Sequence, residues 1–184
     1  MNILIAATGR AGSGKDTFAK PLIEAGFKRA AFADALKELT AFIANEPVGW
    51  YHDPDLKEMH SDALGMTRRS ALQKVGSAMR GVFGENIWCD RVMAEWIASG
   101  KPNTVITDCR YDNEARAVRE AGGTVVSIVR PGEKLLHGES AAHESEKGVN
   151  DDFVAIEVTN NGSINDLRYE THKIIWALRG DTDV

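Results

Sequence analysis

Short apolar runs alternate with segments of helical periodicity along this chain. Largely apolar runs predict buried strands at residues 2–8, 28–33, 104–107, 124–129 and 153–158. Segments with apolar residues at helical spacing predict helices at residues 15–25, 35–44, 67–80, 86–98, 113–121 and 163–178. Strands that alternate with helices in this order predict an α/β fold in which helices cover both faces of a parallel sheet.

Two polar stretches interrupt this alternation. Residues 46–66 hold Pro47, Gly49 and several acidic side chains, which predicts an irregular excursion with a short helix at most. Residues 131–152 are polar and contain Pro131 and three glycines, which predicts a loop or flap. A chain of 184 residues is typical of one domain, so we expect a single domain over residues 1–184 with both stretches as insertions.

Charge and cysteine content exclude several classes of protein. The 22 basic and 27 acidic side chains give a formal charge of −5, which argues against a broad nucleic-acid or membrane-binding surface. Cys89 and Cys109 are too few for a disulfide scaffold, and the first ten residues resemble neither a signal peptide nor a membrane span. We therefore expect a cytoplasmic protein with free thiols, whose ligands are neither membranes nor nucleic-acid polymers. An anionic small molecule remains compatible with the charge, because a site needs only a few local cations.

A glycine-rich loop joins the first predicted strand to the first predicted helix. Its sequence, GRAGSGK, fits the G-x-x-x-x-G-K phosphate loop in the strand–loop–helix setting that this motif requires. The backbone N–H groups of such a loop hold phosphate oxygens, and Lys15 adds a charge where the β- and γ-phosphates of ATP would lie. Asp16 stands where the pattern has Ser or Thr. It either supplies an oxygen to Mg²⁺, directly or through water, or stabilises the helix N-terminus.

The predicted ATP-binding residues extend beyond this lysine. They are Gly9, Arg10, Ala11, Gly12, Ser13, Gly14, Lys15, Asp16, Thr17 and Asn161. Thr17 is the candidate contact to the α-phosphate. Asn161 follows the fifth predicted strand, in a loop that either passes the purine or is an ordinary turn.

A second acid lies at the end of the strand predicted at 104–107. Ligands of open α/β sheets bind at this edge, where an acid holds Mg²⁺ directly or through water. Asp108 is therefore the second candidate metal ligand, although a helix cap or turn residue is the alternative. Arg110, two residues further on, either faces the same crevice or forms a surface salt bridge.

The helix predicted from residue 67 carries Arg69 and Gln73 on one face, because they are four residues apart. A guanidinium suits a pair of phosphate oxygens, and a glutamine amide one turn away can read a base edge. This pairing favours a nucleoside monophosphate acceptor, and a solvated basic helix start is the alternative. The predicted acceptor-binding residues are Asp34, Lys37, Arg68, Arg69, Gln73 and Arg110.

Arg130 ends the fourth predicted strand and opens the polar stretch. It either closes onto the transferring phosphate or forms a hinge salt bridge. His143, Glu144 and Glu146, further along this stretch, have spacing that resembles part of a metal site, but a solvated or substrate-touching flap is the favoured interpretation. The predicted catalytic residues are thus Lys15, Arg69, Arg110 and Arg130.

One ordered series of segments resembles a known family. The segments are GRAGSGKDT, FADALK, TRRSALQKVGS, IWCDR, VITDCRYDNEA, IVRPG, HESE and VTNNGSINDL. The series resembles the bacteriophage-type deoxynucleoside monophosphate kinases, within the P-loop nucleotide and nucleoside kinases, from Asn2 to about Leu178. The resemblance implies a three-layer fold with five parallel strands, the phosphate-loop strand at the centre and the strand of Asp108 beside it.

The resemblance also implies ATP as donor, Mg²⁺ as cofactor and a deoxynucleoside monophosphate as acceptor. The stretch 46–66 would shape the choice of acceptor, and residues 131–152 would act as a lid. Related enzymes are often dimers, so a homodimer is a further expectation. The alternatives are a P-loop kinase acting on dephospho-coenzyme A or phosphomevalonate, a nucleotide-dependent ATPase or switch module, and a catalytically inactive nucleotide-binding scaffold. The absence of an Asn-Lys-x-Asp run argues against a guanine-specific switch.

Overall fold

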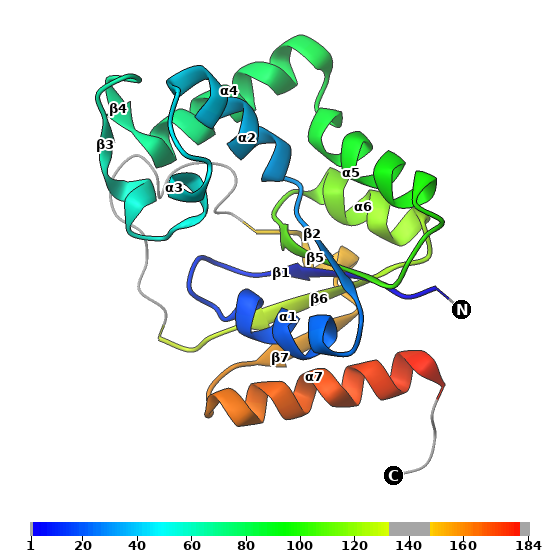
Figure 1. Ribbon diagram of the computed structural model, residues 1–184. Helices are drawn as coiled ribbons and strands as arrows, with labels where there is room; N and C mark the ends of the chain where they lie inside the picture. The colour runs from blue at the N-terminus through cyan, green and yellow to red at the C-terminus, as the bar shows by residue number, and fades with distance from the viewer. Residues whose placement is uncertain (1, 133–147, 181–184) are drawn as a thin grey trace.

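Five parallel strands form the sheet at the centre of the molecule. The computed structural model describes residues 2–132 and 148–180. Its central strands are β1 (Leu4–Thr8), β2 (Lys28–Ala30), β5 (Thr104–Cys109), β6 (Thr124–Val129) and β7 (Ile156–Thr159). They lie side by side in the order β2–β5–β1–β6–β7 (Figure 1). The strand before the glycine-rich loop is therefore central and the strand of Asp108 is its neighbour, which confirms the expected topology.

Helices cover both faces of this sheet, as the pattern predicts. One face carries α1 (Lys15–Glu24) and α7 (Ile164–Arg179), and the other carries α5 (Ile87–Ala98) and α6 (Asp112–Glu120) (Figure 1). The helices α2 (Asp34–Ala44) and α4 (Arg68–Phe83) pack against each other beyond the sheet. The central strand β1 is covered on both faces, and all five of its residues are buried.

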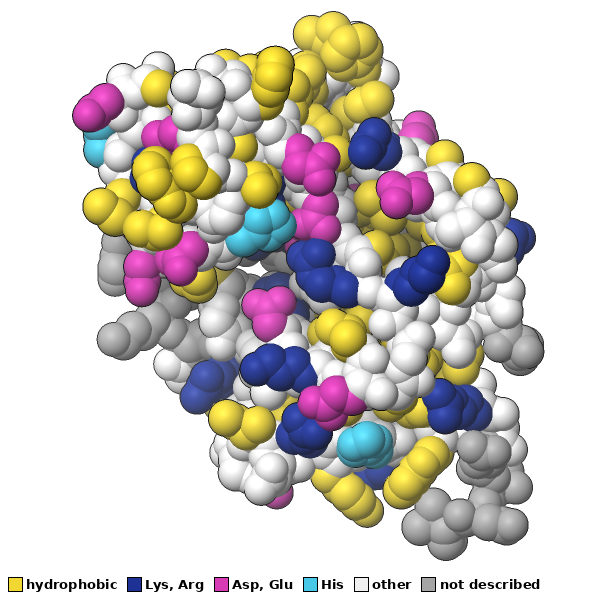
Figure 2. Space-filling view, in the orientation of Figure 1, with side chains coloured by type: hydrophobic (Ala, Val, Ile, Leu, Met, Phe, Trp, Pro, Cys, Tyr) yellow, Lys and Arg dark blue, Asp and Glu magenta, His cyan; other side chains and the backbone are white. Residues whose placement is uncertain are grey.

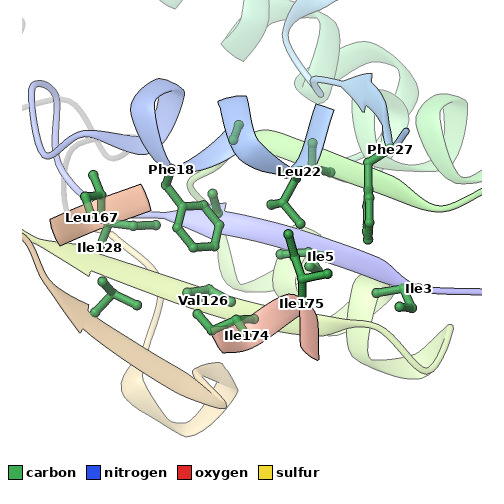
Figure 3. Close-up of a cluster of buried hydrophobic side chains, with 14 residues drawn as sticks. Ile3, Ile5, Phe18, Leu22, Phe27, Val126, Ile128, Leu167, Ile174 and Ile175 are labelled. Carbon is green, nitrogen blue, oxygen red and sulfur yellow. The ribbon is translucent and has the colours of Figure 1, made fainter. Parts of the chain in front are cut away.

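Alternate residues of the strands contribute to two separate hydrophobic cores. Toward α1 and α7, Ile5 and Val126 pack against Phe18 and Ile175 (Figure 3). Toward α5 and α6, Leu4, Ala6 and Ile106 pack against Trp96 and Val118. These two apolar layers explain why the strands are apolar at successive positions instead of at alternate ones.

The stretch expected to be irregular contains several short elements. These are α3 (Gly49–His52), the 3₁₀ helix η1 (Leu56–Glu58) and a small antiparallel hairpin of β3 (His60–Ser61) and β4 (Met66–Thr67). A small core of its own anchors it, in which the fully buried Tyr51 packs with Ala41 and Ala44 of α2. The excursion is therefore folded against α2 and α4 and can hold side chains in defined positions beside them.

Figure 2 shows exposed hydrophobic side chains at several places on one face of the molecule, two of which lie close to the excursion and α4. These two lie over the segment around α3 and at the far end of α4, where Val82 and Phe83 are exposed. Basic and acidic side chains are interspersed over the rest of the face shown. No helix among residues 2–132 and 148–180 has the length and apolarity that crossing a membrane requires.

Several predicted boundaries differ from the observed ones for identifiable reasons. The fifth strand begins at Ile156 instead of residue 153, because Asp151–Phe153 forms the 3₁₀ helix η4 and Phe153 packs against the core beside α6. The second strand ends at Ala30, because the next residues turn toward Asp108. Strand β5 runs to Cys109, so Asp108 lies within it.

The helix ends and the thiols are well defined in the structure. Thr67 and Ser163 cap α4 and α7 through their side chains. Asp34 and Asp112 are the first residues inside their helices. Cys89 and Cys109 are both buried and free, and burial raises the pKa of the Cys89 thiol to about 12. Residues 133–147 of the predicted flap, with His143, Glu144 and Glu146, lie outside the described residues.

Candidate active site

The glycine-rich loop has the backbone conformation that its sequence predicts. Gly9 and Gly14 have φ angles of 135° and 106°, in the region that favours glycine. A Cβ on Gly9 would lie 2.4 Å from the carbonyl oxygen of Ile128, and a Cβ on Gly14 would lie 2.5 Å from Nδ2 of Asn160. Larger residues would thus push the loop off the end of the sheet. The two glycines let the loop turn tightly between β1 and α1.

The side chain of Lys15 folds back over this loop. Its ammonium group donates hydrogen bonds to the carbonyl oxygens of Gly9 and Arg10, both at 2.7 Å. The amide of Asn160, at the end of β7, donates to the carbonyl oxygen of Ser13 at 2.8 Å and so ties the loop to the opposite side of the sheet edge. Among the described residues, the Ser13 hydroxyl is the buried side-chain group without a hydrogen-bond partner.

Asn160 is a loop-supporting residue that the sequence pattern did not single out. The predicted residue, its neighbour Asn161, borders a cavity of about 330 Å³ between the end of β7 and the start of α7. The acidic side chains Glu157, Asp166 and Glu170 share this cavity. Asn160 lines this cavity as well, so the difference between the two residues is the hydrogen bond that Asn160 donates to the phosphate-loop backbone.

Asp108 links β5 to the segment that leads into α2. Its two carboxylate oxygens accept hydrogen bonds from the backbone N–H groups of Phe32 at 2.8 Å and of Ala33 at 3.0 Å. Asp108 also lines a pocket that we call the main pocket, because four of the six predicted acceptor-binding residues line it. Each carboxylate oxygen retains a second lone pair, so the same side chain can fix the turn and still face a ligand.

The main pocket lies between α2, α4 and the end of β5, beside η1. Its volume is about 160 Å³. The lining combines apolar or aromatic walls with basic side chains and a few amide and acidic groups. Its members are Phe32, Ala33, Leu36, Lys37, Lys57, Arg69, Leu72, Gln73, Gly76, Arg80, Trp88, Asp108, Arg110, Tyr111 and Glu114. Apolar walls that carry polar groups able to orient a ligand are typical of a small-molecule site.

Four of the five basic side chains that line this pocket lie near one another, and the fifth is Arg80. Lys37, Arg69 and Arg110 were predicted for acceptor binding, and the structure adds Lys57 from η1. Burial lowers the pKa of Lys57, and the positive charges of Arg69, Lys37 and Arg110 lower it further. An anion at this position would relieve that repulsion. The side chain of Glu58, an exposed neighbour, forms an ion pair with Arg69 in this structure.

No local pattern singles out Lys57, because its position depends on the fold of the excursion. Gln73 lines the same pocket as Arg69, as their spacing predicts. Arg80, Trp88, Tyr111 and Glu114 also line it without having been predicted. Helical spacing from Arg69 and Gln73 through Gly76 to Arg80 is the signal that would have extended the predicted face along α4.

Arg68 lies outside this pocket, unlike the neighbouring Arg69. Its guanidinium donates two hydrogen bonds of 2.8 Å to the carboxylate of Glu46, which also accepts one of 2.7 Å from the Tyr51 hydroxyl. The ring of Trp50 lies 4.5 Å from the same guanidinium. Burial raises the pKa of Glu46, but the hydrogen bonds from Arg68 and Tyr51 outweigh it and leave the pKa below its ordinary value. The side chain of Arg68 therefore holds the excursion against α4 instead of facing an acceptor.

Three other predicted residues lie away from the pocket lining. Asp34 pairs with Arg29 at 2.7 Å and with Lys37 at 3.4 Å. Arg130 follows β6 in an exposed position next to the undescribed residues, so its predicted closure onto phosphate remains a prediction. Asp16 is exposed in the first turn of α1. The hydrogen bond that Arg29 donates to the Asp34 carboxylate raises the pKa of Arg29, and the negative charges of Asp108 and Asp16 raise it further.

The donor groups at the sheet edge fit a magnesium ion that is shared with a nucleotide. Magnesium in nucleotide sites takes one or two carboxylates and completes its shell with phosphate and water oxygens. Asp16 and Asp108 supply two such carboxylates near the glycine-rich loop. No cluster of three or more metal-binding side chains occurs within residues 2–132 and 148–180, so this part of the chain does not form a closed metal site by itself.

Comparisons with solved structures identify the fold. Dephospho-CoA kinase from Campylobacter jejuni is similar with a TM-score of 0.58 and 16% sequence identity, over 99% of this chain and 100% of that chain. The TT1252 protein of Thermus thermophilus is similar with a TM-score of 0.52 and 18% identity, over 96% of this chain and 98% of that chain. At these identities the likeness concerns the fold alone, which is that of a P-loop kinase.

Sequence comparisons identify the family. The model of the family described as deoxynucleotide monophosphate kinase matches residues 57–171. A protein of Acanthamoeba polyphaga mimivirus, named by inference as a deoxynucleotide monophosphate kinase, is 33% identical over a match of 147 residues, and the match covers 71% of this chain and 75% of the viral protein. The matched segment includes Lys57, Arg69, Gln73 and Arg110 of the pocket. With its glycine-rich loop, its kinase fold and this match over more than half its length, the chain belongs to the deoxynucleotide monophosphate kinase family.

Proposed function

We propose that this kinase transfers the γ-phosphoryl group of ATP to the 5′-phosphate of a deoxynucleoside monophosphate, which yields ADP and the deoxynucleoside diphosphate. The observation that carries the proposal is the meeting of four basic side chains, Lys37, Lys57, Arg69 and Arg110, at one end of a pocket with aromatic and apolar walls. The basic end suits a phosphate, and the walls suit a base and a sugar. Family membership supports the same class of acceptor.

The acceptor phosphate needs orientation more than activation. A phosphate monoester has a second pKa near 6, so its oxygens are already nucleophilic at neutral pH. No strong general base is required, and catalysis rests on alignment of the two phosphates and neutralisation of their charge. Arg69 and Arg110 would clamp the acceptor phosphate, and Lys57, whose pKa is lowered by its basic neighbours, would gain the most from an incoming dianion.

The donor would lie on the glycine-rich loop. Lys15 has to exchange its contacts with the carbonyl oxygens of Gly9 and Arg10 for contacts with the β- and γ-phosphates. The loop N–H groups and the N-terminus of α1 would hold the remaining oxygens. Asn160 would keep the loop in its binding conformation through the carbonyl of Ser13.

Asp16 and Asp108 would hold Mg²⁺ on the donor phosphates, directly or through water. When bound, the ion supplies neutralising charge to the β- and γ-phosphate oxygens. Asp108 would hold it while fixing the turn before α2, through Phe32 and Ala33. This arrangement connects the donor side to the segment that carries Lys37.

A coupled assay of ADP release with ATP and Mg²⁺, across a panel of nucleoside monophosphates, tests the proposal. We expect at least one deoxynucleotide to raise the rate well above the water background, and EDTA to abolish turnover. The panel includes dephospho-coenzyme A and phosphomevalonate as rival acceptors. Acceleration by one of these and by no nucleotide would replace the proposed acceptor, and no acceleration by any of them would refute the kinase assignment.

A further inference from the structure

Glu114 connects the two ends of the main pocket through hydrogen bonds of its buried carboxylate. It is the third residue of α6, and 3% of its surface is exposed. One oxygen, Oε2, accepts hydrogen bonds from the backbone N–H groups of Arg110 at 2.8 Å and of Tyr111 at 3.2 Å. The other, Oε1, lies 3.5 Å from Nη2 of Arg80. One side chain therefore contacts three residues that line the pocket.

The contacts of Glu114 extend toward opposite ends of that pocket. Arg110 belongs to the basic end with Lys57 and Arg69, as their mutual charge effect shows. At the other end, the guanidinium of Arg80 lies 4.0 Å from the centre of the Tyr111 ring and donates to the Tyr111 hydroxyl at 3.3 Å. The loop between β5 and α6 thus presents one side chain to the phosphate end and the next to the far end. Glu114 fixes the backbone of both.

We propose that Glu114 is a positioning residue for the acceptor: it sets the placement of Arg110 relative to the Arg80–Tyr111 pair. The inference rests on the proposed function, because it takes the basic end as the site of the acceptor phosphate. Glu114 itself touches neither phosphate in this scheme. The carboxylate is the group suited to the task, since one of its oxygens can accept two N–H bonds while the other faces a guanidinium.

The physical cost of this placement supports a functional role. Burial, aided by the negative charge of Asp108, raises the pKa of Glu114 to about 7, although the N–H groups of Arg110 and Tyr111 and the charge of Arg80 act in the opposite direction. A neutral side chain at this buried position would avoid the free-energy cost of removing a charge from water. The stability of the fold alone therefore does not explain a carboxylate here. Buried ionisable groups with shifted pKa values are common at functional sites.

The test compares E114A and E114Q with E120Q, a matched control at the exposed end of the same helix. Steady-state kinetics give KM and kcat for ATP and for the best acceptor of the panel. We expect E114A to lower kcat/KM for the acceptor roughly 10-fold or more, to change the KM for ATP less than about 2-fold, and E120Q to match wild type. E114Q retains one acceptor oxygen for the N–H groups but turns an amide toward Arg80, so its defect should be intermediate.

A double-mutant cycle with R110A separates positioning from general structural support. If Glu114 acts through Arg110, adding E114Q or E114A to R110A should lower kcat/KM for the acceptor little further than R110A alone does. A full additional loss in the R110A background, or equal losses for ATP and acceptor, would overturn the inference. If E114A does not fold, E114Q carries the same cycle. A wild-type enzyme without nucleotide-dependent turnover refutes the proposed function and the inference with it, whereas normal wild-type turnover with unaffected Glu114 variants refutes the inference alone.

Discussion

Replacing each of the adjacent arginines at the start of α4 by methionine should affect different properties of the protein. The change at Arg68 should lower mainly the melting temperature, and the change at Arg69 should lower mainly kcat/KM for the acceptor. Arg68 forms a bidentate ion pair with Glu46, and the side chains are 7% and 11% exposed. Arg69 pairs with Glu58, whose side chain is 54% exposed. Removing one partner of a buried pair costs about 3–5 kcal/mol, because the other charge stays buried and unpaired. An exposed pair contributes less than about 1 kcal/mol.

These energies translate into measurable melting temperatures. For a chain of this size, each kcal/mol changes Tm by about 2–4 °C. We therefore expect R68M to lower Tm by about 6–20 °C and R69M to lower it by less than about 4 °C, measured by circular dichroism at matched pH and salt. The double variant E46Q/R68M should regain part of the loss, because it removes the unpaired carboxylate.

Enzyme kinetics should show the reverse order. R69M loses charged hydrogen bonds to the acceptor phosphate, each of about 1.5–3 kcal/mol, so kcat/KM for the acceptor should fall roughly 10- to 100-fold with the KM for ATP unchanged. Equal losses of Tm in R68M and R69M would refute the division of roles. So would an R68M protein with wild-type Tm, because the Glu46 carboxylate would then not depend on Arg68.

Three further predictions concern the donor side and pH. K15M should abolish turnover in the ADP-release assay while circular dichroism remains that of the wild type, and residual kcat above a few per cent would contradict the role of Lys15. N160A loses the hydrogen bond to Ser13 and should raise the KM for ATP roughly 3- to 10-fold, more than N161A does, whereas the opposite order would assign the nucleotide contact to Asn161. The pKa of Glu114, raised by burial from 4.5 to about 7, means that the folded state binds a proton that the unfolded chain has lost, so stability falls as pH rises through this window. Urea titrations should therefore show that the free energy of unfolding of E114Q, relative to wild type, rises by up to about 3 kcal/mol between pH 4.5 and 8. A difference in unfolding free energy that does not change with pH would contradict the raised pKa.

Local sequence patterns were sufficient to predict the α/β class and the donor loop, whereas the order of the strands followed from the family resemblance. The apolar runs predicted the five strands because both faces of the sheet are covered, and the loop from Gly9 to Lys15 has a pattern that is complete within seven residues. Thr67 and Ser163 were predictable as caps for the same reason: each accepts a hydrogen bond from an N–H three residues ahead.

The pocket was less predictable, because its composition depends on contacts between distant segments. Arg68 and Arg69 are identical in type and adjacent, and only the fold of the excursion brings Glu46 to one of them. Asp108 was predicted at the sheet edge, but its hydrogen bonds to Phe32 and Ala33 join segments about 75 residues apart. Lys57 enters the site through η1, whose place beside α4 no local pattern specifies.

The central place of β1 in the sheet has a consequence for biosynthesis. Its two hydrogen-bonding edges are covered by β5 and β6, which begin at residues 104 and 124. A nascent chain therefore carries an apolar strand with open edges until β6 has left the ribosome, and such a strand is prone to pair with other chains. Folding of the sheet is postponed until β6 has been synthesised, so premature termination anywhere before β6 should yield aggregation-prone fragments instead of a folded half-domain.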